Sequence, residues 1–266
     1  MILVCTHDAG FFSCCSILLS TIIQYFNKHK VLPEGLDSTQ QFKSYKPVPL
    51  QGTDIRGHYF SSGPIPTLLS KDIPYEGNDD IQFAKYKQLD YVKLLPFMET
   101  YFRPSSDIVW NIQKILAKYD LLSPGSLDNV CALFYRGNDK IKETQLCEYD
   151  DIVERAKELE RIHPQIRFLI QSDETEFFER LFKEFPTNSF CFLDEIRHMK
   201  KSGQVNVDIL STSSHNYIFS KLYLAITVIM SQCGHIICTS GNCSAWIMLY
   251  RKNARNVQQY LNGEWL

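Results

Sequence analysis

A cation and an acid–base pair follow directly on a run of apolar residues in the stretch NVCALFYRGNDKIKE. The run Val130–Tyr135 is typical of a buried strand, and the Gly-Asn pair after Arg136 favours a turn. Arg136 would therefore leave the strand where a crevice opens. Its planar guanidinium matches a phosphate, Lys140 adds a second positive charge, and Asp139 is placed to orient the arginine. An ordinary surface turn with an Arg–Asp pair would fit the same residues.

Small polar residues lie between a second apolar run and a segment with helical spacing: Thr239, Ser240, Gly241 and Asn242. Small side chains let a ligand approach the backbone. The N-terminus of a helix also presents free N–H groups and a partial positive charge, which together favour an anion. Capping of the helix by Asn242 or Ser240 is the alternative explanation of the same pattern.

Two further strand ends carry polar residues. Asp173 ends an apolar run and Glu174 opens a helix, where an acid suits the helix dipole without any ligand. Near the N-terminus, Gly10 lies at another strand-to-helix turn. His7 and Asp8 precede it and are candidates for a site, although a lone histidine beside a core strand is more often structural.

Several familiar chemistries lack their motifs in this sequence. There is no GxGxxG and no GxxxxGK[ST], which disfavours dinucleotide and P-loop chemistry. HExxH, zinc-type Cys/His pairs and Asp-x-Asp are absent too, so we expect no metal site and no metal cofactor. The missing GxSxG elbow gives no support to a Ser-His-Asp hydrolase.

Composition narrows the class of protein further. The 266 residues are 44% hydrophobic with a net charge of −2, so the chain can bury a large core but offers no basic face for nucleic acid. Nine cysteines without a CxxC pair are typical of reduced thiols. The apolar run in 219–230 is interrupted by Lys221 and too short to span a bilayer, and no basic segment opens a signal peptide. We expect a cytoplasmic protein without a membrane span.

The elements fall into two groups. After a turn cluster at 120–129, strands are predicted at 130–136, 166–173, 189–196 and 235–240, and helices at 149–163, 174–185, 216–232 and 243–253. Continuous apolar strands separated by helices imply a parallel sheet covered on both faces, with its ligand beyond the carboxyl ends of the strands. The first group comprises a buried strand in 1–5, a helix at 14–30, a strand in 30–37, an irregular stretch at 38–104, and a helix at 105–119 capped by Ser105 or Ser106. The boundary divides the chain into domains 1–124 and 125–266.

Four segments resemble one superfamily, that of the α1,6-fucosyltransferases, nodulation fucosyltransferases and protein O-fucosyltransferases. FYRGNDK resembles its H-x-R-R-x-D-K peptide, and FLIQSDE resembles its strand ending in T/S-D-[DE]. LAITVIMSQCGHIICTSGNCSAWIMLYR is similar to its closing helix–strand–helix motif, and GFFSCCSILLSTIIQYF to the glycine-bearing loop and helix that start its first domain. The resemblance covers mostly residues 130–251.

The resemblance implies an α/β fold of the GT-B type, with two Rossmann-like domains and a cleft between them. Domain 1–124 would face the acceptor, and domain 125–266 would bind the nucleotide sugar. The implied reaction is an inverting, metal-independent transfer of fucose from GDP-fucose to a hydroxyl of a glycan or glycoprotein.

The resemblance also assigns roles to residues. Arg136 aligns with the essential arginine that pairs with the donor diphosphate. The other implied donor-binding residues are Asp139, Lys140, Asp173, Thr239, Ser240, Gly241, Asn242, Gly10 and Phe11. The acceptor hydroxyl must lose a proton, for which Glu143 is the candidate base and Asp8 the reserve.

This sequence departs from the superfamily at three places. Phe134 stands in place of a histidine, and Gly137 in place of the second arginine. An acid that contacts the nucleoside is expected near Ile226, which has alanine and threonine as neighbours. UDP-xylose therefore stays open as an alternative donor.

Other functions are compatible with the same sequence motifs. A non-catalytic nucleotide- or glycan-binding module would fit the same motifs, and so would a different doubly wound enzyme, such as a methyltransferase or reductase. Eukaryotic members of the superfamily carry an anchor or secretory signal. Because we expect neither here, we expect a bacterial or viral cytosolic member.

Overall fold

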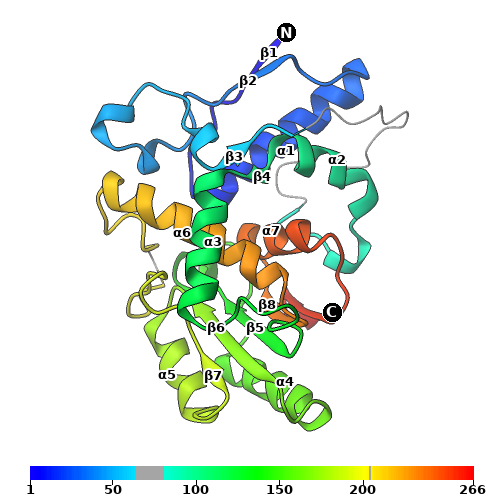
Figure 1. Cartoon of the computed structure of the whole chain (residues 1–266), viewed down its shortest axis with the longest axis vertical. Coiled ribbons are helices and arrows are strands. Elements are labelled where there is room, and N and C mark those ends of the chain that lie inside the picture. Colours follow the sequence, from blue (N-terminus) through cyan, green and yellow to red (C-terminus); the bar gives the residue numbers. More distant parts are fainter. Residues whose placement is uncertain (64–80, 204) are drawn as a thin grey trace.

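The structure, a computed structural model, describes residues 1–63, 81–203 and 205–266. Its helices are α1 (Phe11–His29), α2 (Tyr91–Tyr101), α3 (Ser106–Lys118), α4 (Tyr149–Ile162), α5 (Thr175–Glu184), α6 (Ser213–Ser231) and α7 (Asn242–Arg251). Its strands are β1 (Ile2–Val4), β2 (Gly35–Asp37), β3 (Phe60–Ser61), β4 (Arg103–Pro104), β5 (Val130–Tyr135), β6 (Arg167–Ser172), β7 (Ser189–Phe190), β8 (His235–Thr239), β9 (Val257–Leu261) and β10 (Glu264–Trp265). Figure 1 shows their arrangement.

The main sheet has six strands in the order β10-β9-β8-β5-β6-β7, and all of its pairs are parallel except β9 with β10. Every residue of β5 is buried, as expected for a central strand of a parallel sheet. From β5 the chain proceeds outward through β6 and β7, and then returns to the other side of β5 with β8. The carboxyl ends of β5 and β8 therefore form the topological switch point, where doubly wound proteins bind their ligands.

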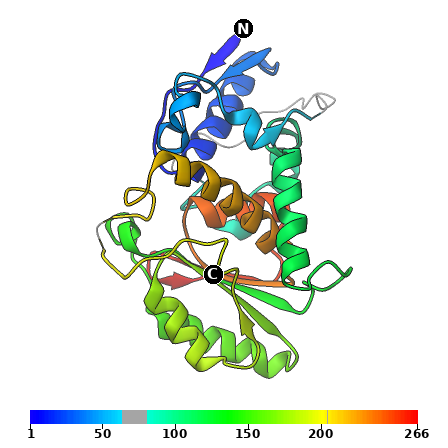
Figure 2. The same cartoon turned by 60° about the vertical axis from the view of Figure 1, so that its left-hand side comes forward.

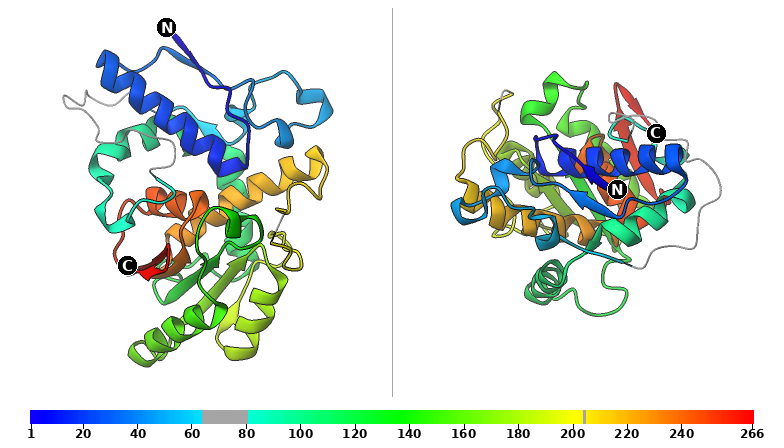
Figure 3. Two further views of the ribbon diagram at one scale, coloured as in Figure 1. Left: turned by 180° about the vertical axis from the view of Figure 1, so that it is seen from behind. Right: turned by 90° about the horizontal axis from the view of Figure 1, so that it is seen from above.

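Helices cover both faces of this sheet. Side chains alternate along β5, so Leu133 packs with α4 and α5 on one face, while Ala132 and Phe134 pack with α6 and α7 on the other. Figure 2 shows these layers, with α4 and α5 at the bottom and α6 and α7 between the sheet and the N-terminal elements. Helix α1 lies across α7, as both views of Figure 3 show, and α3 packs along α6. The predicted parallel sheet and mixed α/β class are confirmed.

One hydrophobic core cluster extends from α1 through α7 and α6 to the upper face of the sheet. It contains buried side chains from both predicted domains, for example Leu18 of α1 and Trp246 of α7. The boundary between 1–124 and 125–266 stays a prediction. In the ranges that the structure describes, no helix has the length and apolar character needed to cross a membrane.

The N-terminal strand departs from its prediction. The pattern of β1 predicts a buried strand, but Ile2 is 65% and Val4 56% exposed. The reason is that β1 belongs to a two-stranded parallel sheet with β2 at the tip of the molecule, apart from the main sheet (Figure 1). Apolar composition alone therefore predicted the strand correctly and its burial wrongly.

The helix ends lie within three residues of the predictions, and the largest differences are at the starts of α1 and α6, where α6 begins at Ser213 instead of 216. Ser105, one of the two predicted caps, is the N-cap of α3 and accepts the N–H of Ile108. Helix α1 begins at Phe11, so the predicted loop is three residues too long. Strand β7 ends at Phe190 instead of 196, because the N–H groups of residues 195 and 196 donate to the carbonyl of Phe192 and turn the chain.

Residues 64–80 of the predicted irregular stretch 38–104 lie outside the described residues. Its described part contains short 3₁₀ turns, the β3–β4 pair and helix α2, which the sequence pattern did not predict. Pro96 lies inside α2, and a proline in the sequence usually indicates the end of a helix. Asp90 nevertheless caps this helix by accepting the N–H of Lys93.

Candidate active site

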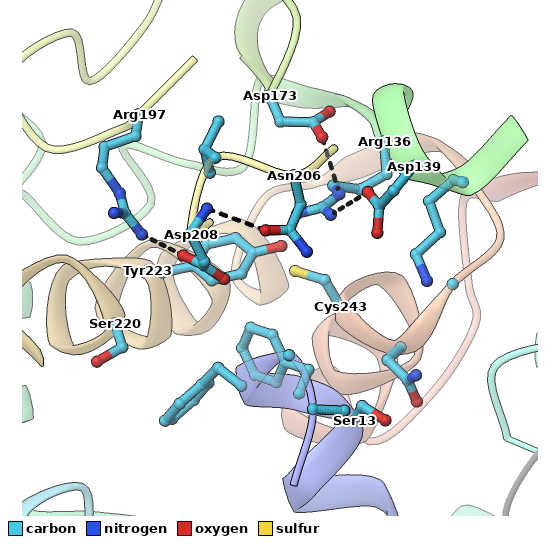
Figure 4. A pocket seen from close by; sticks show the side chains of 18 of the residues that line it. Ser13, Arg136, Asp139, Asp173, Arg197, Asn206, Asp208, Ser220, Tyr223 and Cys243 are labelled. Carbon is cyan, nitrogen blue, oxygen red and sulfur yellow. Dashed lines mark hydrogen bonds and ion pairs between the residues drawn. The ribbon is translucent and has the colours of Figure 1, made fainter. Parts of the chain in front are cut away.

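A cavity of about 790 Å³ opens beyond the carboxyl ends of β5 and β8 (Figure 4). It is enclosed by the N-termini of α1 and α7, the turn after β5, the loop between β7 and α6, and one side of α6. The structure brings most of the predicted site residues together in its lining: Gly10, Phe11, Arg136, Asp139, Lys140, Glu143, Asp173, Gly241 and Asn242.

Arg136 is held on two sides. Its backbone N–H donates to Oγ1 of Thr239 at 3.1 Å, which ties the end of β5 to the end of β8. Its guanidinium lies between two carboxylates, with Nη2 3.4 Å from Asp139 Oδ1 and Nε 3.4 Å from Asp173 Oδ2 (Figure 4). Burial opposes the charge of Arg136, but the negative groups around it, Asp173 foremost, raise the pKa of the guanidinium well above its usual value. Arg136 is a fixed positive charge at the rim of the sheet.

Lys140 and Glu143 reach the cavity as a pair. They belong to the 3₁₀ turn η5 (Asn138–Lys142) and the residue after it, and Lys140 Nζ lies 2.5 Å from Glu143 Oε2. The side chain of Lys140 is 15% exposed and that of Glu143 is 39% exposed. Glu143 is thus an accessible carboxylate in the lining of the cavity, and its role as a general base stays a prediction.

The N-terminus of α7 is open. Gly241 is its N-cap and no side chain caps it, so the alternative explanation, a cap by Asn242 or Ser240, is wrong. The Asn242 side chain instead accepts the hydroxyl of Ser16 at 2.6 Å and donates to Gln82 at 2.9 Å. A Cβ added at Gly241 would meet nothing within 4 Å. The first turn of α7 therefore keeps the donors and the partial positive charge that an anion requires.

Three predicted site residues lie outside the cavity lining. Thr239 holds the backbone of Arg136. Ser240 is buried, and its hydroxyl donates to the carbonyl of Tyr260 at 2.7 Å. Asp8 is exposed and accepts the N–H of Lys43 at 2.9 Å.

A polar network that sequence reasoning missed closes the other end of the cavity. Asp208 forms an ion pair with Arg197 (Figure 4) and also accepts the hydroxyl of Tyr45 at 2.6 Å. Tyr45 in turn accepts the N–H of Phe11 at 2.8 Å. Burial, and then the Asp208 charge, raise the pKa of Tyr45 well above its usual value, so its hydroxyl stays a donor. The network joins the loop before α6 to the N-terminus of α1.

Two more lining residues lie near Arg136. Tyr223 of α6 packs its ring edge-on against Phe12 at 5.0 Å, and burial raises the pKa of its hydroxyl well above the usual value. Cys243 opens α7, and burial raises the pKa of its thiol to about 11. The thiol is therefore protonated at neutral pH, which makes it a poor nucleophile. Tyr223 by contrast is a neutral lining residue whose side chain interacts with the thiol of Cys243.

The acidic side chains around the cavity are bound to cations. Asp139 and Asp173 pair with Arg136, and Asp208 pairs with Arg197. Among the residues that the structure describes, no three His, Cys, Asp or Glu side chains gather as a metal site would require. Metal independence stays a prediction.

The sheet order, the cavity at its switch point and the helices above it define an α/β protein of the GT-B-like fold. One solved structure with this likeness is NodZ alpha-1,6-fucosyltransferase co-crystallized with GDP, at a TM-score of 0.52 and 12% sequence identity over 100% of this chain and 97% of that chain. The same enzyme soaked with GDP-fucose gives a TM-score of 0.49 and 12% identity over the same shares. Comparisons with models of known families and with curated proteins find no match. The predicted resemblance to fucosyltransferases is confirmed at the level of the fold.

Proposed function

We propose that the protein is a glycosyltransferase that moves a sugar from a nucleotide sugar to a hydroxyl of a glycan or glycoprotein. The observation that carries the proposal is the meeting of Arg136, Lys140 and the uncapped N-terminus of α7 in one cavity at the switch point. Cationic side chains and a free helix N-terminus are groups that bind a diphosphate. The NodZ structure of the same fold was co-crystallized with GDP.

The proposed reaction is a single displacement with inversion. The acceptor oxygen attacks the anomeric carbon while the bond to the β-phosphate oxygen breaks, and the bonding electron pair leaves on that oxygen. Arg136, Lys140 and the first turn of α7 would stabilise the growing negative charge without a metal. The acceptor proton would pass to Glu143, because Glu143 lines the cavity and Asp8 does not.

GDP-fucose is the donor that we propose first, since the sequence resemblance and the NodZ structure with GDP both favour it. A nucleoside with another base, as in UDP-xylose, is the second candidate. The observation in its favour is that Ala225, Ile226 and Thr227 are fully buried in α6, at the place where the superfamily's acid contacts the nucleoside. In this chain that part of α6 offers no group to a guanine.

A melting-temperature screen tests the proposal. GDP-fucose, GDP-mannose, UDP-xylose and UDP-glucose are each added to the protein, with an adenosyl methyl donor as the unrelated ligand. A true donor at about 100 times its Kd adds about 2.7 kcal/mol to the stability, which is a shift of a few degrees. Release of nucleoside diphosphate in the presence of glycan acceptors then separates an enzyme from a binding module. Stabilisation by the adenosyl ligand alone would overturn the proposal.

Metal independence is tested in the same assay. Transfer is expected to persist within twofold when EDTA is present, because the fixed charges of Arg136 and Lys140 would stand where other glycosyltransferases place a cation. Loss of transfer in EDTA, with recovery on addition of Mn²⁺ or Mg²⁺, would contradict this part of the proposal. Heat-denatured enzyme and a donor-free mixture are the blanks.

A further inference from the structure

Glu174 is a buried carboxylate that the proposed reaction does not use. It is 0% exposed and lies just before α5, behind the wall of the cavity. Its Oε1 accepts the backbone N–H of Asn138 at 2.6 Å, and its Oε2 accepts the hydroxyl of Tyr149. In the described ranges Glu174 has no ion pair with a cation, so its charge is balanced by these donors and by the N-terminus of α5.

The turn that Glu174 holds is shaped around its carboxyl group. A Cβ added at Gly137 would overlap that carboxyl group, so the turn can lie against Glu174 only with glycine at this position. Asn138 adopts a left-handed conformation with φ of 44°, which asparagine tolerates better than most residues. Asp173, the residue before Glu174, completes the attachment. Its carboxylate accepts the N–H of Gly137 at 3.0 Å, and its backbone carbonyl accepts the side-chain amide of Asn138 at 3.0 Å.

This attachment decides where Arg136 points. Its own N–H is fixed to β8 through Thr239, and the next two residues are fixed to Asp173 and Glu174. An acid needed only for the dipole of α5 would serve as well in a solvated position, whereas burial of a carboxylate is costly unless hydrogen bonds satisfy it. The hydrogen bonds of Glu174 go to the turn and to Tyr149.

We propose that Glu174, oriented by Tyr149, is a positioning residue that sets the turn carrying Arg136 in the geometry required for transfer. The proposal rests on the proposed function, from which Arg136 takes its role. Glu174 does not line the cavity, so it acts through the turn and not on the substrate. Misplacement of a reacting group by about 1 Å can cost roughly 10²-fold in rate, so a loosened turn is expected to lower kcat strongly.

A double-mutant cycle tests this. Glu174→Gln, Tyr149→Phe and Arg136→Ala are made singly, and each of the first two is combined with the third. Tyr149→Phe removes one hydroxyl and keeps the buried carboxylate, so it stays informative even where Glu174→Gln fails to fold. Each single change at 149 or 174 is expected to lower kcat about 10-fold or more, with a smaller change in the KM of the donor. In the Arg136→Ala background the further loss is expected to stay within about twofold.

Losses that multiply in the double variants would overturn the proposal, because they would show that Glu174 acts independently of Arg136. Glu179→Gln is the matched control, since Glu179 is an exposed acid of the same helix, and wild-type kinetics are expected. Amide hydrogen exchange at Asn138 is measured in the same variants. Faster exchange in Tyr149→Phe and Glu174→Gln, and not in Glu179→Gln, supports the attachment, and unchanged exchange refutes it.

Loss of the proposed function and loss of the positioning role would give different results. A wild-type protein that binds no nucleoside diphosphate and transfers no sugar would end the proposed function. Exchange at Asn138 would in that case still decide whether Glu174 holds the turn. A wild type that transfers sugar, with kcat unchanged in both Tyr149→Phe and Glu174→Gln, would end the positioning role and leave the proposed function intact.

Discussion

Replacement of Arg136 by alanine is expected to lower kcat by about 10²- to 10³-fold, the usual cost of removing one preorganised donor from a developing negative charge. The guanidinium is held by Asp139 and Asp173, so it needs no reorganisation when the diphosphate leaves. Arg136→Lys is expected to lose nearly as much. A lysine keeps the charge but cannot contact both carboxylates and the phosphate in one plane. The measurement is steady-state transfer at saturating acceptor, together with nucleoside diphosphate affinity.

The control for this pair is Arg161→Ala. Arg161 lies on α4, on the far side of the sheet, and its side chain is 76% exposed, so wild-type turnover is expected. Turnover within tenfold of wild type in both Arg136 variants would remove Arg136 from the chemistry. Weak nucleotide binding with a normal kcat would instead show that Arg136 binds substrate and transition state equally.

The parallel sheet could be predicted because its strands are buried on both faces, and their sequences are therefore continuous apolar runs between helices. The last two strands were missed although a local signal exists. Asn262 and Gly263 form the turn between β9 and β10 with φ of 48° and 94°, and an Asn-Gly pair between alternating residues is a strong hairpin signal. The burial of strand β1 could not be predicted in this way. It depends on which elements pack against the strand, and the sequence of the strand itself does not contain that information.

The candidate site divides in the same way. Arg136, Asp173 and Gly241 could be predicted to meet, since the carboxyl ends of parallel strands lie at one edge of the sheet. Tyr45 and Asp208 could not, because each lies in a long connection whose path is set by tertiary contacts. The capping of α7, the alternative explanation of its polar start, is also wrong. A small polar residue at a helix start favours a cap, but here Asn242 is engaged by Ser16, a partner from the other end of the chain.

Trp246→Ala is expected to lower the free energy of unfolding by about 3–5 kcal/mol, the usual cost of removing a large buried aromatic side chain. Trp246 of α7 is fully buried, and its ring lies 4.8 Å from Phe102 and 6.0 Å from Phe12 of α1. Its Nε1 donates to the hydroxyl of Ser16 at 2.9 Å. The side chain thus connects α7, whose N-terminus lines the cavity, to the N-terminal elements. Denaturant unfolding followed by circular dichroism measures the change.

Trp110→Ala is the matched control, because Trp110 is 66% exposed on α3 and its removal is expected to change stability by no more than about 0.5 kcal/mol. Trp246→Phe keeps a buried aromatic ring but loses the bond to Ser16 and part of the packing, so its cost is expected to lie between those of Trp110→Ala and Trp246→Ala. A continuous core also predicts that α1 and the sheet unfold in one transition, whichever tryptophan is changed. A cost for Trp246→Ala as small as that for Trp110→Ala would mean that α1 and α7 are not held together by this side chain, and the cavity between their N-termini would then lack its main support.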